Sequence, residues 1–171
     1  MAQLLVVIGG LCLNPTMTET PKFLIQAAHE QAIQGLIVRA NWAIDHGDMD
    51  ALMSCLHPDV TFVRPDGQVL QGPQAVRDAY ARRDPDRLTR HLLSNVHMRW
   101  LSTCRVEAHA SVLLWMGRQS SEATVSGRLA EPVQKLGEHR DVFIFYEVRW
   151  WLLQRQSEFI FFVEIFLYPT V

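Results

Sequence analysis

The arrangement of residue patterns along the chain constrains its fold most strongly. Patterns typical of helices occupy residues 20–81, interrupted by one short β-prone stretch. Long runs rich in Val, Ile, Phe and Trp then follow at residues 91–101, 106–117, about 139–154 and 157–167, and a segment poor in large apolar residues separates the middle two. Helices that precede a series of strands are typical of α+β proteins with an antiparallel sheet. The sequence therefore predicts three N-terminal helices packed on an antiparallel sheet.

The first and longest helix is predicted from Thr20 to about His46. Thr20 is a capping residue, and Pro21 follows at the first helical position, where its missing N–H costs nothing. Gly47 can end the helix because glycine adopts the left-handed conformation without strain. The apolar residues between these ends recur at helical spacing, which predicts one buried face; they are Ile25, Ala28, Ala32, Ile33, Leu36, Ile37, Ala40 and Ile44.

Two shorter helices and a hairpin are predicted next. Residues 48–55 carry an aspartate that can cap a short helix at its start. An Asp-Gly turn at residues 66–67 lies between the β-prone residues 60–63 and 68–70, which predicts a hairpin. A Gly-Pro pair then begins a third helix, whose apolar residues lie between residues 75 and 80.

Composition and charge narrow the class of protein. The 171 residues are 49% hydrophobic and 20% charged, enough for one globular domain with its own core. The formal net charge of −2 gives no reason to expect nucleic acid or a membrane as a partner. The three cysteines have no regular spacing and provide neither a disulfide framework nor a metal motif, so we expect a cytoplasmic protein.

Residues 1–19 are predicted to be a disordered extension, followed by a single domain at residues 20–171. The apolar run from Leu4 to Leu13 lacks the preceding Lys or Arg of a secretory signal. The run is also too short to span a bilayer. We therefore expect it to be neither a signal peptide nor an anchor.

Several segments resemble, in order, the nuclear-transport-factor-2-like superfamily, and in particular its SnoaL-like branch of polyketide cyclases and dehydratases. The segments are Asp45-His46-Gly47-Asp48-Met49-Asp50-Ala51-Leu52, His57-Pro58-Asp59-Val60, Gly72-Pro73-Gln74-Ala75-Val76 and Thr89-Arg90-His91-Leu92-Leu93-Ser94-Asn95. The resemblance covers roughly residues 25–165. It implies a cone-shaped α+β barrel of the cystatin-like kind, in which a curved sheet wraps around the helices.

The resemblance continues less closely toward the C-terminus. Asp141-Val142-Phe143 and Trp151-Leu152-Leu153-Gln154-Arg155 are similar to two patterns of the family's later strands. Between them, Glu147-Val148-Arg149-Trp150 stands where the family usually has small turn residues, and its glycine is absent. The strand boundaries in this part are left open.

The resemblance also implies a pair of catalytic residues. Scytalone dehydratase and bile-acid dehydratase in this branch use a His-Asp pair, and the matching positions here are Asp45 and His91. A helical wheel places Asp45 at the edge of the apolar stripe. A partly buried carboxylate there would orient the imidazole and fix its tautomer. The alternatives stay open that Asp45 is solvated near a helix end and that His91 is a satisfied polar residue at the rim of the cone.

Such a pair could remove a proton next to a carbonyl and return one to a leaving hydroxyl. General acid–base help of this kind is worth on the order of a hundred- to ten-thousand-fold in rate. We therefore expect a lyase or isomerase, dehydratase- or cyclase-like, that acts on a hydrophobic cyclic small molecule. Sequence motifs for nucleotide or zinc binding are absent, so we expect no cofactor and no metal.

Four further residues are candidates for substrate binding. Asn41 lies on the apolar face of the first helix, and Trp115 is one of several tryptophans that could line a pocket for an aromatic substrate. Asn95 and His97 share strand parity with His91, so they face the same cavity if no bulge intervenes. His139 is predicted to be a structural residue in a charged turn.

A second function and an assembly are also predicted. The same cone serves as a non-catalytic small-molecule binder and as the β subunit of ring-hydroxylating dioxygenases, which shares the strand entry around His91. The apolar stretch Phe159-Ile160-Phe161-Phe162-Val163 would promote aggregation if it were exposed. We therefore expect a homodimer or homotrimer that covers it.

Overall fold

The computed structural model describes residues 7–8, 11–12 and 22–164. Near the N-terminus, β1 (Val7–Ile8) and β2 (Leu11–Cys12) pair with each other in antiparallel fashion. The rest of the predicted extension at residues 1–19, and the helix start predicted at Thr20-Pro21, lie outside the described residues. None of the helices in the described ranges is long and apolar enough to cross a membrane.

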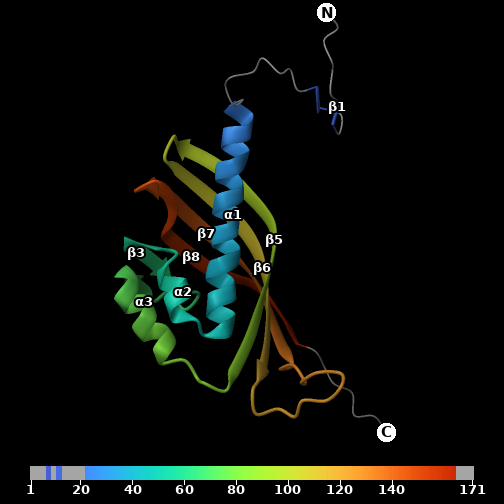
Figure 1. Ribbon diagram of the computed structural model, residues 1–171. Coiled ribbons are helices and arrows are strands. Elements are labelled where there is room, and N and C mark those ends of the chain that lie inside the picture. Colours follow the sequence, from blue (N-terminus) through green and yellow to red (C-terminus); the bar gives the residue numbers. More distant parts are fainter. Residues whose placement is uncertain (1–6, 9–10, 13–21, 165–171) are drawn as a thin grey trace, which may run out of the picture.

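Helix α1 (Lys22–His46) lies along the concave side of the curved sheet (Figure 1). Its buried face follows the predicted apolar stripe from Ile33 to Ile44. The helix ends at Gly47, whose φ of 69° is left-handed. The backbone amide of Asp48 then donates to the carbonyl of Ala43 at 2.9 Å, which satisfies a terminal carbonyl of the helix.

Two shorter helices cover the remaining edge of the sheet. In α2 (Met49–Met53), the carboxylate of Asp48 accepts a hydrogen bond from the amide of Ala51 at 2.9 Å, as predicted for a capping residue. Helix α3 (Gly72–Ala81) follows the hairpin and carries its proline in the first turn. Helix α2 ends before the predicted Cys55, because the carbonyl of Cys55 already accepts from the amide of Leu152 on the sheet.

Six strands form the main sheet in the order β4-β3-β8-β7-β6-β5. Their bounds are β3 Leu56–Val63, β4 Val69–Gln71, β5 Arg87–Ser102, β6 Arg105–Arg118, β7 Val133–Tyr146 and β8 Arg149–Glu164. The α+β prediction is confirmed, but the prediction of an antiparallel sheet is wrong at one pair, since β3 and β8 are parallel. Strands β5 to β8 follow one another across the sheet, which places β8 beside β3 of the earlier hairpin. The alternation of apolar residues along a strand does not indicate whether β3 and β8 run parallel or antiparallel.

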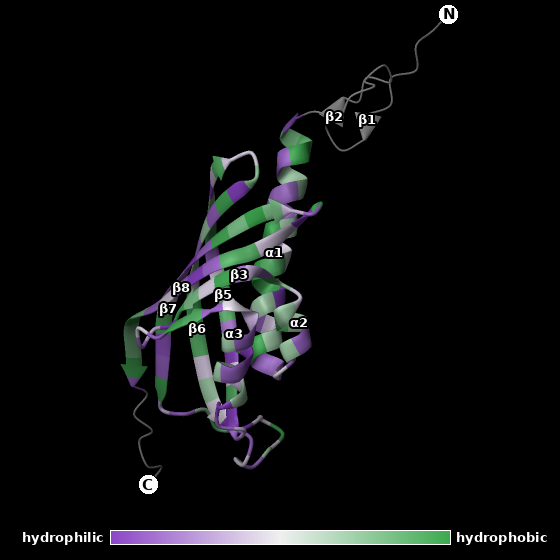
Figure 2. Cartoon of the chain, turned by 90° about the vertical axis from the view of Figure 1, so that its left-hand side faces the viewer, coloured by the Kyte–Doolittle hydropathy of each residue, from purple (hydrophilic) through white to green (hydrophobic). Residues whose placement is uncertain are grey.

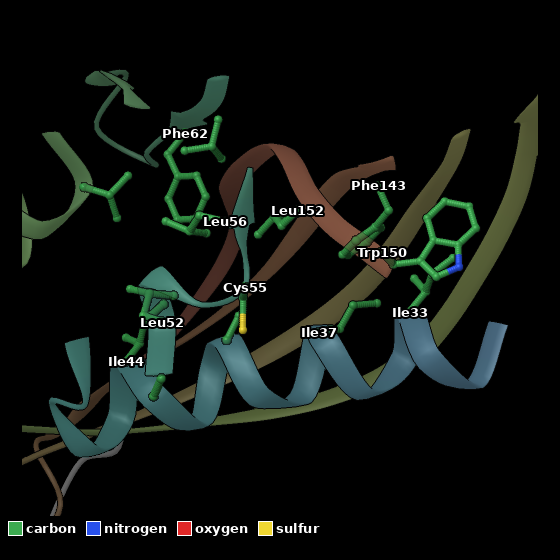
Figure 3. Packing of buried hydrophobic residues seen from close by; sticks show 14 of the residues in the cluster. Ile33, Ile37, Ile44, Leu52, Cys55, Leu56, Phe62, Phe143, Trp150 and Leu152 are labelled. Atoms are coloured by element: carbon green, nitrogen blue, oxygen red, sulfur yellow. The ribbon is translucent and has the colours of Figure 1, made fainter. Parts of the chain in front are cut away.

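The hydrophobic core fills the space between α1 and the sheet. Figure 3 shows Ile33 and Ile37 of α1 pointing toward Phe143 of β7 and Leu152 of β8, all of which are fully buried. On β6, every second residue from Val106 to Met116 is buried, so this strand turns one face to the core. Each fully buried large aliphatic side chain contributes about 1.5–3 kcal/mol to stability.

The apolar run at about 139–154, whose strand boundaries the sequence left open, contains the end of β7 and the start of β8, because the chain reverses in the middle of it. Glu147 and Val148 have φ values of 48° and 60°, and the flanking Tyr146 and Arg149 are paired across β7 and β8. Two left-handed residues between paired strands are the geometry of a type I′ hairpin turn. Such turns normally contain Asn or Gly, and neither occurs here, so the residue types give no signal for this turn, although the family resemblance places turn residues at this position.

Replacing Val148 by glycine is expected to raise the free energy of unfolding by about 1 kcal/mol, because a β-branched residue is strained in the left-handed region. Val148 is 92% exposed, so the change removes no packing. Chemical denaturation measures the effect. Val125→Gly is the matched control, since Val125 is equally exposed but has no positive φ. A gain of the same size in both variants would contradict this explanation.

Candidate active site

A cavity of about 370 Å³ lies between α1, α3 and the inner face of the sheet. Its apolar wall is formed by residues such as Ile44, Phe62 and Leu114, and polar side chains enter from five elements. These polar residues include Asn41 of α1, Tyr80 of α3, Thr89 and His91 of β5, His139 of β7, and Arg155 and Ser157 of β8. A cavity of this size and mixed lining is typical of small-molecule sites.

The structure brings Asp45 and His91 together at the edge of this cavity. Nδ1 of His91 lies 2.6 Å from Oδ1 of Asp45, and the backbone amide of His91 donates to Oδ2 of Asp45 at 2.8 Å. The hydroxyl of Thr89 also donates to Oδ1 at 2.8 Å. Three donors therefore hold one carboxylate. The side chains of His91 and Asp45 are only 14% and 6% exposed, so Asp45 is not solvated, contrary to one of the alternatives considered from the sequence.

These contacts determine the charge of Asp45 and the tautomer of His91. Burial by itself would raise the pKa of the Asp45 carboxyl. The hydrogen bond and positive charge of the His91 ring, the His91 amide and the Thr89 hydroxyl outweigh burial, so the pKa lies below its ordinary value. An ionised Asp45 accepts the proton on Nδ1 of His91, which leaves Nε2 as the nitrogen available for proton transfer.

Arg155 forms a second buried pair, with Asp141. Its Nε and Nη2 donate to the two carboxylate oxygens of Asp141 at 2.8 and 2.6 Å, and both side chains are almost completely buried. The remaining terminal nitrogen, Nη1, is buried and has no hydrogen-bond partner among the described residues. Arg155 lines the cavity through other atoms and gives its wall a positive charge, whereas Nη1 itself is closed off from the cavity.

His139 lines the cavity from the middle of β7 and is not in a turn, so the prediction of a turn is wrong. The amide nitrogen of Asn41 donates to the carbonyl of Ile37 at 2.8 Å, which makes the side-chain oxygen of Asn41 the acceptor for Nε2 of His139 at 3.3 Å. Nδ1 of His139 then accepts from the hydroxyl of Ser157 at 2.9 Å. Burial, together with the positive charge of Arg155, lowers the pKa of His139 well below its ordinary value, so the ring is neutral at pH 7.

Asn41 lines the cavity, whereas Asn95, His97 and Trp115 are not among the residues that line it in the described part of the chain. The pairing of β5 with β6 shifts between Ser94 and His97, and Asn95 has a left-handed φ of 51°. This bulge reverses the strand parity, so His97 is exposed while the neighbouring Val96 is half-buried. Trp115 alternates with the buried residues of β6 and is 39% exposed. The expectation that these three residues line the cavity is corrected accordingly.

Sequence reasoning missed His139, Tyr80 and Arg155 as cavity residues. Arg155 could have been identified from the sequence, because the segment that ends at this residue resembles a pattern of the family's last strand. Tyr80 was assigned only to the apolar side of a helix, and its pKa is raised by burial. Among the described residues, no group of three or more His, Cys, Asp or Glu side chains is placed to hold a metal ion.

Solved structures similar to this one share its fold. Hexachlorocyclohexane dehydrochlorinase of type 3 (LinA) from Novosphingobium barchaimii has a TM-score of 0.71 at 17% identity, over 86% of this chain and all of that one. A protein provisionally named a scytalone dehydratase from Novosphingobium aromaticivorans has a TM-score of 0.68 at 13% identity, over 85% and 93%. An NTF2-like protein with a cystatin-like fold from the same species has a TM-score of 0.63 at 14% identity, over 81% and 86%.

No curated protein sequence matches the chain. The sequence profile of the family described as SnoaL-like domain matches residues 26–156, which is most of the chain and includes Asp45, His91 and Arg155. The resemblance noted from the sequence is thereby confirmed. The chain belongs to the SnoaL-like domain family, with an NTF2-like, cystatin-like fold.

Proposed function

We propose that the chain is a lyase or isomerase of the dehydratase or cyclase kind, in which Asp45 and His91 carry out general acid–base catalysis. The observation that carries this proposal is the contact of 2.6 Å between Asp45 and His91 at the edge of the cavity. An imidazole held by a carboxylate, with its second nitrogen free for a substrate, is the arrangement that proton transfer requires. The proposal also agrees with the dehydrochlorinase and the dehydratase named among the similar structures.

For a dehydration, the steps balance without an electron carrier. Nε2 of His91 removes the proton next to a substrate carbonyl, and the electrons of that C–H bond form the new C=C bond. The C–O bond to the β-hydroxyl breaks, and the same nitrogen returns the proton so that water leaves. The ionised Asp45 stabilises the protonated ring between these steps. We accordingly propose no cofactor and no metal.

Arg155 has a further part in this proposal. As the proton leaves, negative charge develops on the carbonyl oxygen, and a fixed positive charge near this oxygen lowers the barrier. The guanidinium of Arg155 supplies such a charge in the cavity wall, although its Nη1 is closed off and does not donate to the substrate. Asp141 holds the guanidinium in a fixed orientation through two hydrogen bonds, so little reorganisation is needed during reaction.

The substrate is proposed to be a hydrophobic cyclic small molecule. The apolar wall of the cavity supports this class, together with a volume of about 370 Å³ that suits one or two fused rings. Asn41 lines the cavity beside the pair and already bonds to His139, so we assign it to shaping the pocket.

A panel of cyclic β-hydroxy ketones tests the function, with each member prepared with and without a carboxylate. Incubation in deuterated water is expected to show exchange at the carbon next to the carbonyl, or loss of water, for at least one member, as followed by NMR. His91→Gln is expected to abolish both signals. If the wild-type protein is as inactive as His91→Gln on every member, the non-catalytic binder or dioxygenase-subunit alternative replaces this proposal.

We also propose that a second copy of the chain covers the end of β8. Phe161 and Phe162 are 63% and 70% exposed there, and Figure 2 shows this end of the strand as hydrophobic. Sedimentation at micromolar concentration is expected to give a dimer or trimer, which the double variant Phe161→Ser/Phe162→Ser shifts toward monomer. Val38→Ser, a change at an exposed position of α1, serves as the control. A monomeric wild-type protein would contradict the assembly.

A further inference from the structure

A group of arginines borders one end of the cavity. Arg82 and Arg83 belong to the segment between α3 and β5, Arg87 is the first residue of β5, and Arg64 follows β3. All four line the same cavity as His91, in addition to the buried Arg155. Guanidinium groups seldom gather around an apolar pocket unless they bind an anion or are paired with carboxylates.

Arg83 and Arg87 lack such carboxylate partners. Arg83 donates to the hydroxyl of Thr89 at 2.7 Å and to the carbonyl of Ile44 at 3.4 Å. In the described part of the chain, the one hydrogen-bond acceptor of the Arg87 side chain is the sulfur of Met116, at 3.4 Å. Within the described residues, no Asp or Glu oxygen lies within 4.0 Å of either guanidinium. Both groups therefore have N–H donors left for a ligand.

Two of the carboxylates near these arginines are engaged elsewhere. Asp45 is held by His91 and Thr89. Asp84, which lines the cavity, bonds to Arg118 at 2.9 Å. The other two acidic residues of the lining, Glu138 and Glu158, are register partners on β7 and β8. Among the described residues, Arg83 and Arg87 therefore lack a compensating carboxylate, whereas Arg64 lies 3.9 Å from Asp66.

The lowered pKa of Arg83 agrees with a gathering of positive charges at this part of the cavity. Burial lowers the pKa of its guanidinium, and the positive charges of Arg87 and Arg64 lower the pKa further. The negative charge of Asp45 acts in the opposite direction but does not cancel these effects. A bound anion would relieve the repulsion between these groups.

We propose, resting on the proposed function, that the substrate of this site carries a carboxylate that Arg83 and Arg87 bind. Arg83 is connected to the catalytic pair through Thr89, which donates in turn to Asp45. An anion held by Arg83 therefore places the rest of a small substrate next to His91. The apolar wall then packs against the ring, so charge at one end and hydrophobic contact at the other orient the molecule.

Matched pairs of ligands test the proposal by calorimetry, without any turnover. The probes are 1-naphthoate, 2-naphthoate and cyclohexanecarboxylate, each compared with its uncharged primary amide. The wild-type protein is expected to bind at least one carboxylate about ten- to a hundred-fold more tightly than the matching amide, because charge-assisted hydrogen bonds are the stronger kind. This preference is expected to weaken at high ionic strength.

The variants identify the groups responsible. Arg87→Gln is expected to lower carboxylate affinity about ten-fold and to leave amide affinity unchanged, and Arg87→Lys is expected to restore part of the loss. Arg99→Gln is the control, since Arg99 is paired with Glu107 and does not line the cavity. Thermal unfolding establishes that each variant is folded.

Three outcomes would overturn the carboxylate site: equal binding of acids and amides, no effect of Arg87→Gln, or no binding of any probe at millimolar concentration. The outcome for catalysis is separate. His91→Gln is expected to keep the preference for carboxylates, because this residue belongs to the catalytic pair and not to the anion site. If the wild-type protein converts neutral ketones but shows no preference for carboxylates, the proposed function remains and the anion site is excluded.

Discussion

Replacing Asp45 by Asn is expected to lower kcat/KM about a thousand-fold on any substrate that the ketone panel identifies. The carboxylate accepts hydrogen bonds from the ring of His91, the amide of His91 and the hydroxyl of Thr89. An asparagine has a single acceptor oxygen, so its NH₂ group must face one of these donors. The imidazole then loses both its orientation and the negative charge that stabilises its protonated form, and effects of this size follow when acid–base catalysis is lost.

The loss is expected mainly in kcat, because Asp45 is proposed to act on the protonated ring and not on the bound substrate. Asp50→Asn is the control, since Asp50 is exposed on α2 and pairs with Arg77. An Asp45→Asn variant that retains more than about a tenth of wild-type activity would exclude this residue from catalysis.

The same substitution has a consequence that needs no substrate. The pKa of Asp45 is lowered in the folded protein, so its ionised form stabilises the fold above the ordinary carboxyl pKa of about 4. That stabilisation is lost as the pH falls through the lowered pKa. Thermal unfolding measured from pH 6 downward is therefore expected to show a steeper loss of stability below about pH 4 for the wild type than for Asp45→Asn.

Replacing Asp141 by Ala is expected to lower the free energy of unfolding by about 3–5 kcal/mol, because the change leaves the charge of Arg155 buried and unpaired. Asp141 supplies both acceptors of this guanidinium, at 2.8 and 2.6 Å. Chemical denaturation measures the loss. Asp50→Ala, which breaks the exposed pair with Arg77, is expected to cost less than about 1 kcal/mol.

A double variant separates the loss of the pair from the cost of the unpaired charge. Asp141→Leu/Arg155→Met replaces both charged groups by apolar ones of similar size, and it is expected to recover most of the stability that Asp141→Ala loses. Activity is expected to stay low, since the positive charge of Arg155 in the cavity wall is removed. A double variant as unstable as Asp141→Ala would show that the pair itself stabilises the fold.

Much of the fold could be predicted from local patterns. The stripe from Ile33 to Ile44 indicated the buried face of α1, and Gly47 indicated its end, because both depend on residues close in sequence. The turn at Glu147 and Val148 could not be predicted in this way. Its left-handed backbone is imposed by the pairing of β7 with β8, against the preference of the residues that adopt it.

The candidate site divides in the same manner. Asp45 and His91 could be nominated by matching segments of a family, although they are 46 residues apart. Asn95 and His97 were assigned to the cavity by strand parity, and a single bulge next to them reversed that parity. His139 could not be assigned, because its role depends on Asn41 and Ser157, which come from two other elements.

The sequence by itself determined the order of helices and strands, the SnoaL-like family and the two residues of the proposed pair, because these depend on residue identity and on short-range spacing. Only the tertiary structure decided which strand faces enter the cavity, that β3 runs parallel to β8, and that Arg155 is buried against Asp141, with Nη1 unpaired among the described residues. These features depend on contacts between segments that are distant in sequence. Such contacts form only when the sheet closes around α1, and local preferences do not specify them.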